Sequence, residues 1–152
     1  MGLNLRIAFV STYPPTHCGV GEYTRMLLSA IKSLVPNYEL YVLCDEGCGP
    51  ERYDHGVGAY VRPTFKRGSN SYQELLNAIS DLGGFDIIHV QHEYGIFGRG
   101  DGILRVLLRA KDEGLIRKII FTLHTVYHPL SNDHEALRFQ KILSLADAIV
   151  VH

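Results

Sequence analysis

Residues 5–34 read LRIAFVSTYPPTHCGVGEYTRMLLSAIKSL, and three successive patterns in them predict how the fold is organised. The apolar run at 5–10 predicts a strand that is buried on both faces of a parallel sheet. The turn at 11–21 contains two prolines and two glycines, which the interior of a strand or a helix does not accommodate. Apolar residues then recur at helical spacing over 22–34. Because the first N–H groups of a helix lack intrahelical partners, this turn is predicted to bind an anion such as phosphate, unless its glycines serve only the tight turn.

The composition is that of an ordinary globular domain. The chain has 152 residues, of which 46% are hydrophobic and 20% are charged, and its formal net charge is -1. Because nucleic-acid-binding domains carry clustered positive charge, this balance argues against a nucleic acid partner. No apolar run approaches the ~20 residues that span a bilayer, and the short apolar segment near the N-terminus indicates a strand rather than a signal peptide. We therefore expect one cytoplasmic domain.

Three cysteines, Cys18, Cys44 and Cys48, give an odd count in a chain that shows no signal peptide. This combination predicts free thiols in a reducing compartment. Cys44 and Cys48 have a C-x3-C spacing, but no second pair of cysteines completes a zinc site. We therefore interpret both as structural thiols of a loop.

Strand and helix patterns alternate along the rest of the chain. Strands are predicted at 38–44, 59–62, 86–91, 118–123 and 148–151, and helices at 71–82, 103–113 and 133–145. Pro63 is expected to stop the third strand, and residues 45–58 are expected to form a loop. The alternation predicts an α/β fold, a Rossmann-like, doubly wound parallel sheet in three layers with the strand order 3-2-1-4-5-6.

Ligands of such sheets bind beyond the carboxyl ends of the strands, where the strand order reverses. Three loops reach that edge in this chain, at 13–21, 92–98 and 124–128. His92 and Glu93 follow one strand and His124 follows the next, so imidazole and carboxylate groups are expected to face one cleft. There they would bind hydroxyl groups or move a proton. The alternative left open is that His124 only caps its strand by bonding to a backbone carbonyl.

A nicotinamide dinucleotide site is a weaker alternative. Gly19-x-Gly21 resembles the start of the glycine fingerprint of such sites, and Asp45 ends the second strand, where an acidic residue would hold a ribose. However, eight residues with two prolines separate the first strand from these glycines, and Thr24 stands where the fingerprint needs Gly or Ala.

A metal site is the second alternative. By residue type, the candidate ligands are His89, His92, Glu93, His124 and His128. However, strand residues three apart point to opposite faces, so His89 and His92 are not expected to share a set of ligands. We expect no metal, and we interpret His89 as a histidine that makes a hydrogen bond within the sheet.

Four segments resemble, in the same order, those of family 4 nucleotide-sugar glycosyltransferases. They are STYPP (11–15) with CGVGEYT (18–24), QHEYGIFG (91–98), FTLHT (121–125) and ADAIVVH (146–152). Members of this family have the GT-B fold, in which two Rossmann-like domains face each other across a cleft. The resemblance implies that residues 1–152 form the N-terminal, acceptor-side domain. It also implies a truncated domain that lacks the C-terminal donor domain and is inactive alone.

The resemblance implies roles for individual residues. Gly19, Val20 and Gly21 would approach the diphosphate of the donor, although Cys18 stands where the family often has a further glycine. His124 would be the catalytic residue, facing the acceptor and the reacting sugar. The acceptor site would comprise polar side chains and flat aromatic faces, namely Tyr13, His92, Glu93, Tyr94 and Thr125.

The implied reaction transfers a sugar, with retention of configuration, from a nucleotide-diphosphate sugar to a hydroxyl acceptor, and it needs neither a metal nor another cofactor. The acceptor would be a sugar, a polyol or a lipid-linked molecule. A C-terminal domain, or a partner chain that replaces it, would hold the donor nucleotide. Because many relatives use lipid-linked acceptors, a peripheral position at the inner membrane face is left open. The rival hypothesis is a non-catalytic scaffold domain that docks a partner chain.

Overall fold

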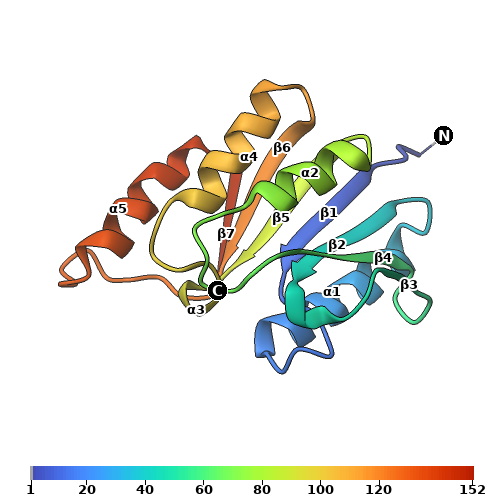
Figure 1. The fold of residues 1–152 in the computed structure, drawn as a ribbon, viewed down its shortest axis with the longest axis horizontal. Helices are drawn as coiled ribbons and strands as arrows, with labels where there is room; N and C mark the ends of the chain where they lie inside the picture. Colours follow the sequence, from blue (N-terminus) through green and yellow to red (C-terminus); the bar gives the residue numbers. More distant parts are fainter. Residues whose placement is uncertain (1) are drawn as a thin grey trace.

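The computed structural model describes residues 2–152, which form a seven-stranded sheet with helices on both faces (Figure 1). The strands are β1 (Arg6–Ser11), β2 (Glu39–Asp45), β3 (Arg52–Asp54), β4 (Ala59–Phe65), β5 (Phe85–His92), β6 (Ile116–Leu123) and β7 (Ala148–Val151). Their order in the sheet is β3-β4-β2-β1-β5-β6-β7. Neighbouring strands run parallel, except that β3 pairs with β4 in antiparallel orientation. The six predicted strands correspond to all of these but β3, and their predicted order is confirmed.

The helices divide into two layers. They are α1 (Gly19–Leu34), α2 (Gln73–Asp81), α3 (Tyr94–Phe97), α4 (Gly102–Asp112) and α5 (His134–Ile142). On one face of the sheet, Leu28 of α1 packs with Phe9 and Val42. On the opposite face, α2, α4 and α5 pack on a larger cluster that includes Val90 and Phe121 (Figure 1). The predicted doubly wound arrangement is therefore confirmed.

The apolar run of β1 explains its central place. Ala8, Phe9 and Val10 are all buried, because helices cover both faces of the sheet at this strand. Phe9 pairs in register with Val42 of β2 on one side and with His89 of β5 on the other. The strand order therefore reverses between β1 and β5, which is where doubly wound sheets bind ligands.

Two details of the sheet differ from the prediction. The expected loop at 45–58 contains a 3-10 turn, Glu46–Cys48, and the strand β3, which is too short to show an alternating pattern. In addition, β4 continues through Pro63 to Phe65, so the prediction that this proline stops the strand is wrong. Because β3 pairs with β4 only as far as Val61, the rest of β4 has one neighbouring strand, and an edge of this kind tolerates a proline.

Cys44 and Cys48 form a disulfide with their Cα atoms 6.2 Å apart, so the prediction of free thiols is wrong for this pair. Cys44 lies in β2, and the 3-10 turn Glu46–Cys48 brings the chain back toward it. Cys18 keeps a free thiol. The spacing alone did not reveal the bridge, because two cysteines this close in sequence can pair only where the chain turns tightly. The cysteines therefore give no support to a reducing compartment.

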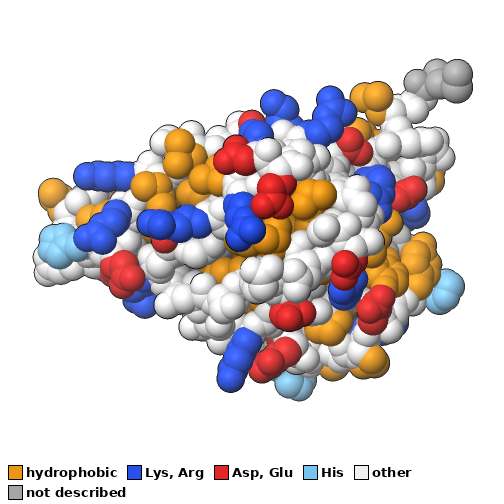
Figure 2. All heavy atoms as spheres, turned by 45° about the horizontal axis from the view of Figure 1, so that its top comes forward, with side chains coloured by type: hydrophobic (Ala, Val, Ile, Leu, Met, Phe, Trp, Pro, Cys, Tyr) orange, Lys and Arg blue, Asp and Glu red, His pale blue; other side chains and the backbone are white. Residues whose placement is uncertain are grey.

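The surface carries both signs of charge. Figure 2 shows acidic and basic side chains mixed over the face that it presents, with hydrophobic side chains between them. On α4, Arg105 pairs with Asp101 at 2.7 Å and Arg109 pairs with Glu113 at 3.0 Å. None of the helices described is long and apolar enough to cross a membrane.

Gly84 and Gly114 precede β5 and β6, and substitutions at these two glycines can test how closely the chain packs where these strands begin. Both have a left-handed backbone, with φ of +80° and +78°, which costs an L-residue about 1–2 kcal/mol. A Cβ at Gly84 would also lie 2.6 Å from the carbonyl oxygen of Leu115, whereas one at Gly114 meets no described atom within 4 Å. We expect Gly84→Ala to lower the free energy of unfolding by about 1–3 kcal/mol more than Gly114→Ala does. Urea unfolding measures both, and equal losses would contradict the packing described.

Candidate functional site

The carboxyl ends of β1, β5 and β6 lie side by side, so the loops that follow these strands meet at one edge of the sheet (Figure 1). The ring of His124, which follows β6, lies 5.0 Å from the ring of Tyr23 near the start of α1, measured between centroids. Thr125 donates a 3.3 Å hydrogen bond to Glu93, which follows β5. His124 and the glycine turn at Gly19 therefore occupy the same rim, which we call the carboxyl rim.

The N-terminus of α1 is open at this rim. The helix begins at Gly19, so the glycines form its first turn rather than precede it. Cys18 at the N-cap makes no capping hydrogen bond with its side chain. A Cβ at Gly21 would lie 3.2 Å from backbone atoms of Thr12, whereas one at Gly19 would meet no described atom within 4 Å. An uncapped N-terminus with free space beside its first residue suits an anion such as a phosphate group.

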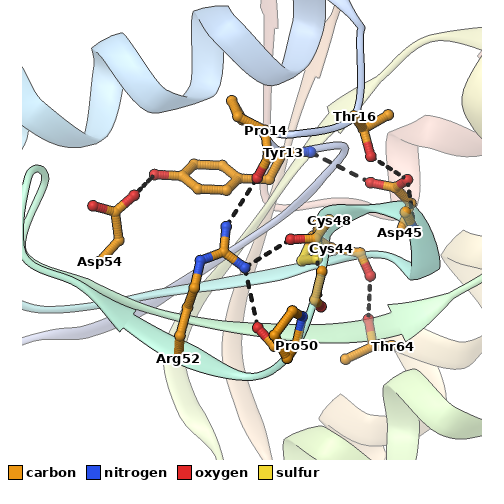
Figure 3. Close-up of a disulfide and its surroundings, with 12 residues drawn as sticks. Tyr13, Pro14, Thr16, Cys44, Asp45, Cys48, Pro50, Arg52, Asp54 and Thr64 are labelled. Atoms are coloured by element: carbon orange, nitrogen blue, oxygen red, sulfur yellow. Dashed lines mark hydrogen bonds between the residues drawn. A yellow bond between two sulfur atoms is a disulfide. The ribbon is translucent and has the colours of Figure 1, made fainter.

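Asp45 holds the loop between β1 and α1 in place (Figure 3). Its Oδ2 accepts hydrogen bonds from the Thr16 hydroxyl at 2.8 Å and from the Gly47 N–H at 3.2 Å. Its Oδ1 accepts a longer bond, 3.4 Å, from the Tyr13 N–H. Because both oxygens are engaged and the residue is buried, Asp45 presents no free carboxylate to a ribose. This geometry argues against the nicotinamide alternative.

Tyr13, a residue of this loop, and Arg52 of β3 connect the loop to the neighbouring chain (Figure 3). Tyr13 is fully buried, and its hydroxyl donates a 2.7 Å hydrogen bond to Asp54. Burial, followed by this bond, raises the pKa of Tyr13. Arg52 donates to the carbonyl oxygens of Pro14 at 2.9 Å and Cys48 at 2.7 Å. Tyr13 therefore anchors the loop, and its position does not fit the prediction that it lines the acceptor site.

His124 is half-buried at the carboxyl rim. Its Nε2 lies 2.8 Å from Oε1 of Gln91, so its ring bonds to a side-chain amide rather than to a backbone carbonyl. The rings of Tyr23 and His152 lie 5.0 Å and 5.1 Å away. Burial lowers the pKa of His124, His152 lowers it further, and Glu93 acts in the opposite direction. At neutral pH the imidazole is therefore neutral, with one nitrogen able to accept a hydrogen bond or a proton.

The other predicted acceptor residues fall into two groups. Glu93 and Thr125 are half-buried beside His124, and Glu93 also caps α3 through its side chain. Tyr94, in contrast, is buried, and its hydroxyl donates a 3.2 Å hydrogen bond to Gln140 of α5. Burial raises the pKa of Tyr94 to about 12. Tyr94 thus links α3 to α5, and its position does not fit the predicted acceptor site.

His92 is fully buried on the face covered by α2, α4 and α5. Its ring stacks on Phe139 at 4.5 Å and on Phe97 at 5.5 Å, and neither ring nitrogen has a hydrogen-bond partner among the described residues. Burial, with a smaller effect of His124, lowers its pKa to about 3. His92 pairs in register with Leu123, so His124 points to the opposite face. The prediction that His92 lines a pocket together with His124 is therefore wrong.

Gln91 is the site residue that sequence reasoning missed. It precedes His92, so it points to the face that His124 shares, and it pairs in register with Thr122. The alternation of side chains along a strand is the signal that identifies it, because this alternation places Gln91 on the face opposite to His92 at the end of β5. His89 lies on the same face, with Nε2 2.6 Å from the Thr122 hydroxyl. This contact confirms the prediction that His89 makes a hydrogen bond within the sheet.

The carboxyl rim presents backbone N–H groups that an anion could meet. Between residues 2 and 152, no group of three or more His, Cys, Asp or Glu side chains is arranged to hold a metal ion. His89 and His124 lie on one face of the sheet and His92 lies on the other. The open N–H groups at Gly19 are therefore what a phosphate-bearing ligand would meet.

A separate hollow of about 420 Å³ lies at the opposite, amino ends of β2 and β4. Its aromatic lining consists of four tyrosines, Tyr38, Tyr41, Tyr53 and Tyr60. It is remote from the glycine turn and from His124, and it lacks a histidine or an open helix N-terminus. We therefore place the site at the carboxyl rim, where the ligands of doubly wound sheets bind.

The chain matches a known family of proteins. A family model described as Glycosyltransferase Family 4 matches residues 18–152. The matched range begins at Cys18, so it includes Gly19, Gly21 and every strand from β2 to β7. No curated protein matches the chain.

The buried state of His92 predicts a specific loss of stability in acid. Its pKa is lowered in the folded chain, so below the ordinary value of about 6.5 the unfolded chain binds a proton that the folded chain does not. The free energy of unfolding should therefore fall by up to about 1.4 kcal/mol per pH unit from this group as the pH drops below 6.5. His92→Phe removes the group and should flatten that slope.

At pH 7 the same substitution should change stability little, because neither ring nitrogen of His92 has a partner to lose. Urea unfolding between pH 7 and pH 4 measures both effects. His134→Phe, which replaces an exposed histidine, serves as the control. A slope that is the same in His92→Phe as in the unsubstituted chain would contradict the buried, neutral state of His92.

Proposed function

The chain belongs to glycosyltransferase family 4, and from this premise we propose that it forms the acceptor-side half of an enzyme that transfers a sugar from a nucleotide-diphosphate donor to a hydroxyl acceptor. One observation carries the proposal. The open N-terminus of α1 at Gly19 and the neutral imidazole of His124 share the carboxyl rim, joined by the contact of Tyr23 with the His124 ring. An anion site and a group able to accept a proton are what such a transfer needs.

The glycine turn would bind the diphosphate of the donor. The N–H groups of Gly19, Val20 and Gly21 are the first three of α1, and they would meet the negative charge that grows on the leaving group. The loop before them is held by Asp45 and Arg52, so these N–H groups need little rearrangement when that charge develops. No metal or other cofactor enters this scheme.

His124 would orient the acceptor hydroxyl or the reacting sugar. Its free ring nitrogen can accept a hydrogen bond at neutral pH, because burial keeps the imidazole uncharged. Glu93 and Thr125 lie beside it and would complete the acceptor side. Retention of configuration is proposed from the family resemblance alone.

The donor nucleotide would be held by a second domain, which either the same polypeptide or a partner chain supplies. Residues 1–152 alone would then turn over little substrate. The acceptor would be a sugar, a polyol or a lipid-linked molecule, and the enzyme would work in the cytoplasm or at the inner membrane face.

The anion site can be tested in the 152-residue chain with inorganic pyrophosphate as a probe of the donor diphosphate. We expect titration to shift the amide resonances of Gly19, Val20 and Gly21. Gly19→Asp should abolish these shifts by charge repulsion, yet it should stabilise α1 by about 0.3–1 kcal/mol through its dipole. Gly19→Ala should keep the shifts, since its side chain enters open space. If pyrophosphate shifts none of these amide resonances in the unsubstituted chain, that result would favour the scaffold hypothesis.

The role of His124 can be tested in the enzyme completed by its donor-binding domain. We expect His124→Ala to lower turnover by more than about tenfold, because a positioned acid–base group typically contributes at least that much. His55→Ala, which replaces an exposed histidine between β3 and β4, should leave turnover unchanged. Steady-state kinetics with a nucleotide sugar provide the measurement. Unchanged turnover in His124→Ala would remove this residue from the mechanism.

A further inference from the structure

Gln91 is an unexpected residue for the place that it occupies. Its side chain is fully buried on the face of the sheet that α1 covers, where Phe9 and Leu28 belong to the apolar cluster. Its Nε2 has no hydrogen-bond partner among residues 2–152. A buried amide with an unpaired N–H group destabilises a fold, and an apolar side chain here would avoid that cost. The position of Gln91 therefore calls for a compensating role.

The other end of the amide supplies that role. Oε1 of Gln91 lies 2.8 Å from Nε2 of His124. Within the described chain, this is the one hydrogen bond that the His124 ring makes, because Tyr23 and His152 contact it only through their rings. The opposite ring nitrogen, Nδ1, makes no hydrogen bond among the described residues, and it is not fully enclosed in this half-buried side chain.

We propose that Gln91 is a positioning residue that fixes His124 in the tautomer with its proton on Nε2, and so presents the lone pair of Nδ1 to a substrate hydroxyl. The amide oxygen only accepts hydrogen bonds, so its partner nitrogen must carry the proton. In a neutral imidazole the other nitrogen is then an acceptor. The use of that lone pair in sugar transfer rests on the proposed function, whereas the tautomer does not.

The neighbouring pair on the same two strands provides a matched control. His89 and Thr122 lie one pair further from the rim, with Nε2 2.6 Å from the hydroxyl oxygen. A hydroxyl both donates and accepts, so it does not impose one tautomer as an amide oxygen does. A change at Thr122 should therefore alter the signals of His89 and leave those of His124 in place.

The test is a long-range proton–nitrogen NMR spectrum of the 152-residue chain with ¹⁵N-labelled histidine at neutral pH. The spectrum of His124→Ala identifies the signals of His124. In the unsubstituted chain we expect a protonated Nε2 and an unprotonated Nδ1. Gln91→Met has a similar length but no acceptor oxygen, and it should give averaged signals from both tautomers. Gln91→Glu keeps an acceptor oxygen and should keep the Nε2–H form, while Thr122→Val should change only His89.

A protonated Nδ1 in the unsubstituted chain would overturn the proposal, as would a single Nε2–H tautomer that persists in Gln91→Met. If Gln91→Met does not fold, the spectra of the unsubstituted chain and of Gln91→Glu still test the proposal. Loss of the Nε2–H form in Gln91→Glu would also contradict it. The outcome is independent of sugar transfer. An Nε2–H tautomer held by Gln91 in an enzyme that does not need His124 would leave this inference standing and would remove His124 from the proposed mechanism.

Discussion

The close approach of α1 to β1 is the constraint on which the carboxyl rim depends. Gly21 lies against the backbone of Thr12, where any Cβ would be 3.2 Å from the nearest atoms, and the hydroxyl oxygens of Ser11 and Thr24 lie 2.8 Å apart beside it. A larger residue at Gly21 would force the helix away from the strand. With α1 seated in this way, its uncapped N-terminus opens onto the rim and its next turn contacts the ring of His124.

The two faces of the sheet carry different chemistry at the ends of β5 and β6. On the face covered by three helices, His92 fills a space among aromatic rings, where burial keeps it neutral and out of reach of any ligand. On the face covered by α1, Gln91 and His124 bond to each other, as do His89 and Thr122. Adjacent strand residues point to opposite faces of the sheet. His92 therefore packs in the core, whereas Gln91, one residue earlier, contacts the proposed chemical group His124.

The loop between β1 and α1 is held from below by the end of β2 and by β3. Asp45 bonds to the loop through both carboxylate oxygens, and Tyr13 and Arg52 reach across to Asp54 and Pro14. These contacts explain why a segment rich in proline and glycine is ordered enough to present N–H groups in one arrangement. Preorganised donors of this kind stabilise developing charge without rearrangement during a reaction, which is the role that the proposed function gives to them.

The sequence by itself determined the class of fold, the order of the parallel strands and the three loops that meet at one edge. Periodicity and turn residues act locally, and right-handed crossovers then leave few ways to arrange the strands. The tertiary structure decided those features that depend on contacts between separate segments of the chain. It placed Pro63 inside an edge strand, joined Cys44 to Cys48, and turned His92 into the core while Gln91 met His124. Whether a side chain packs in the core or makes a hydrogen bond depends on the residue opposite it on the neighbouring strand. The amino-acid sequence does not identify that residue until the register of the strands is known.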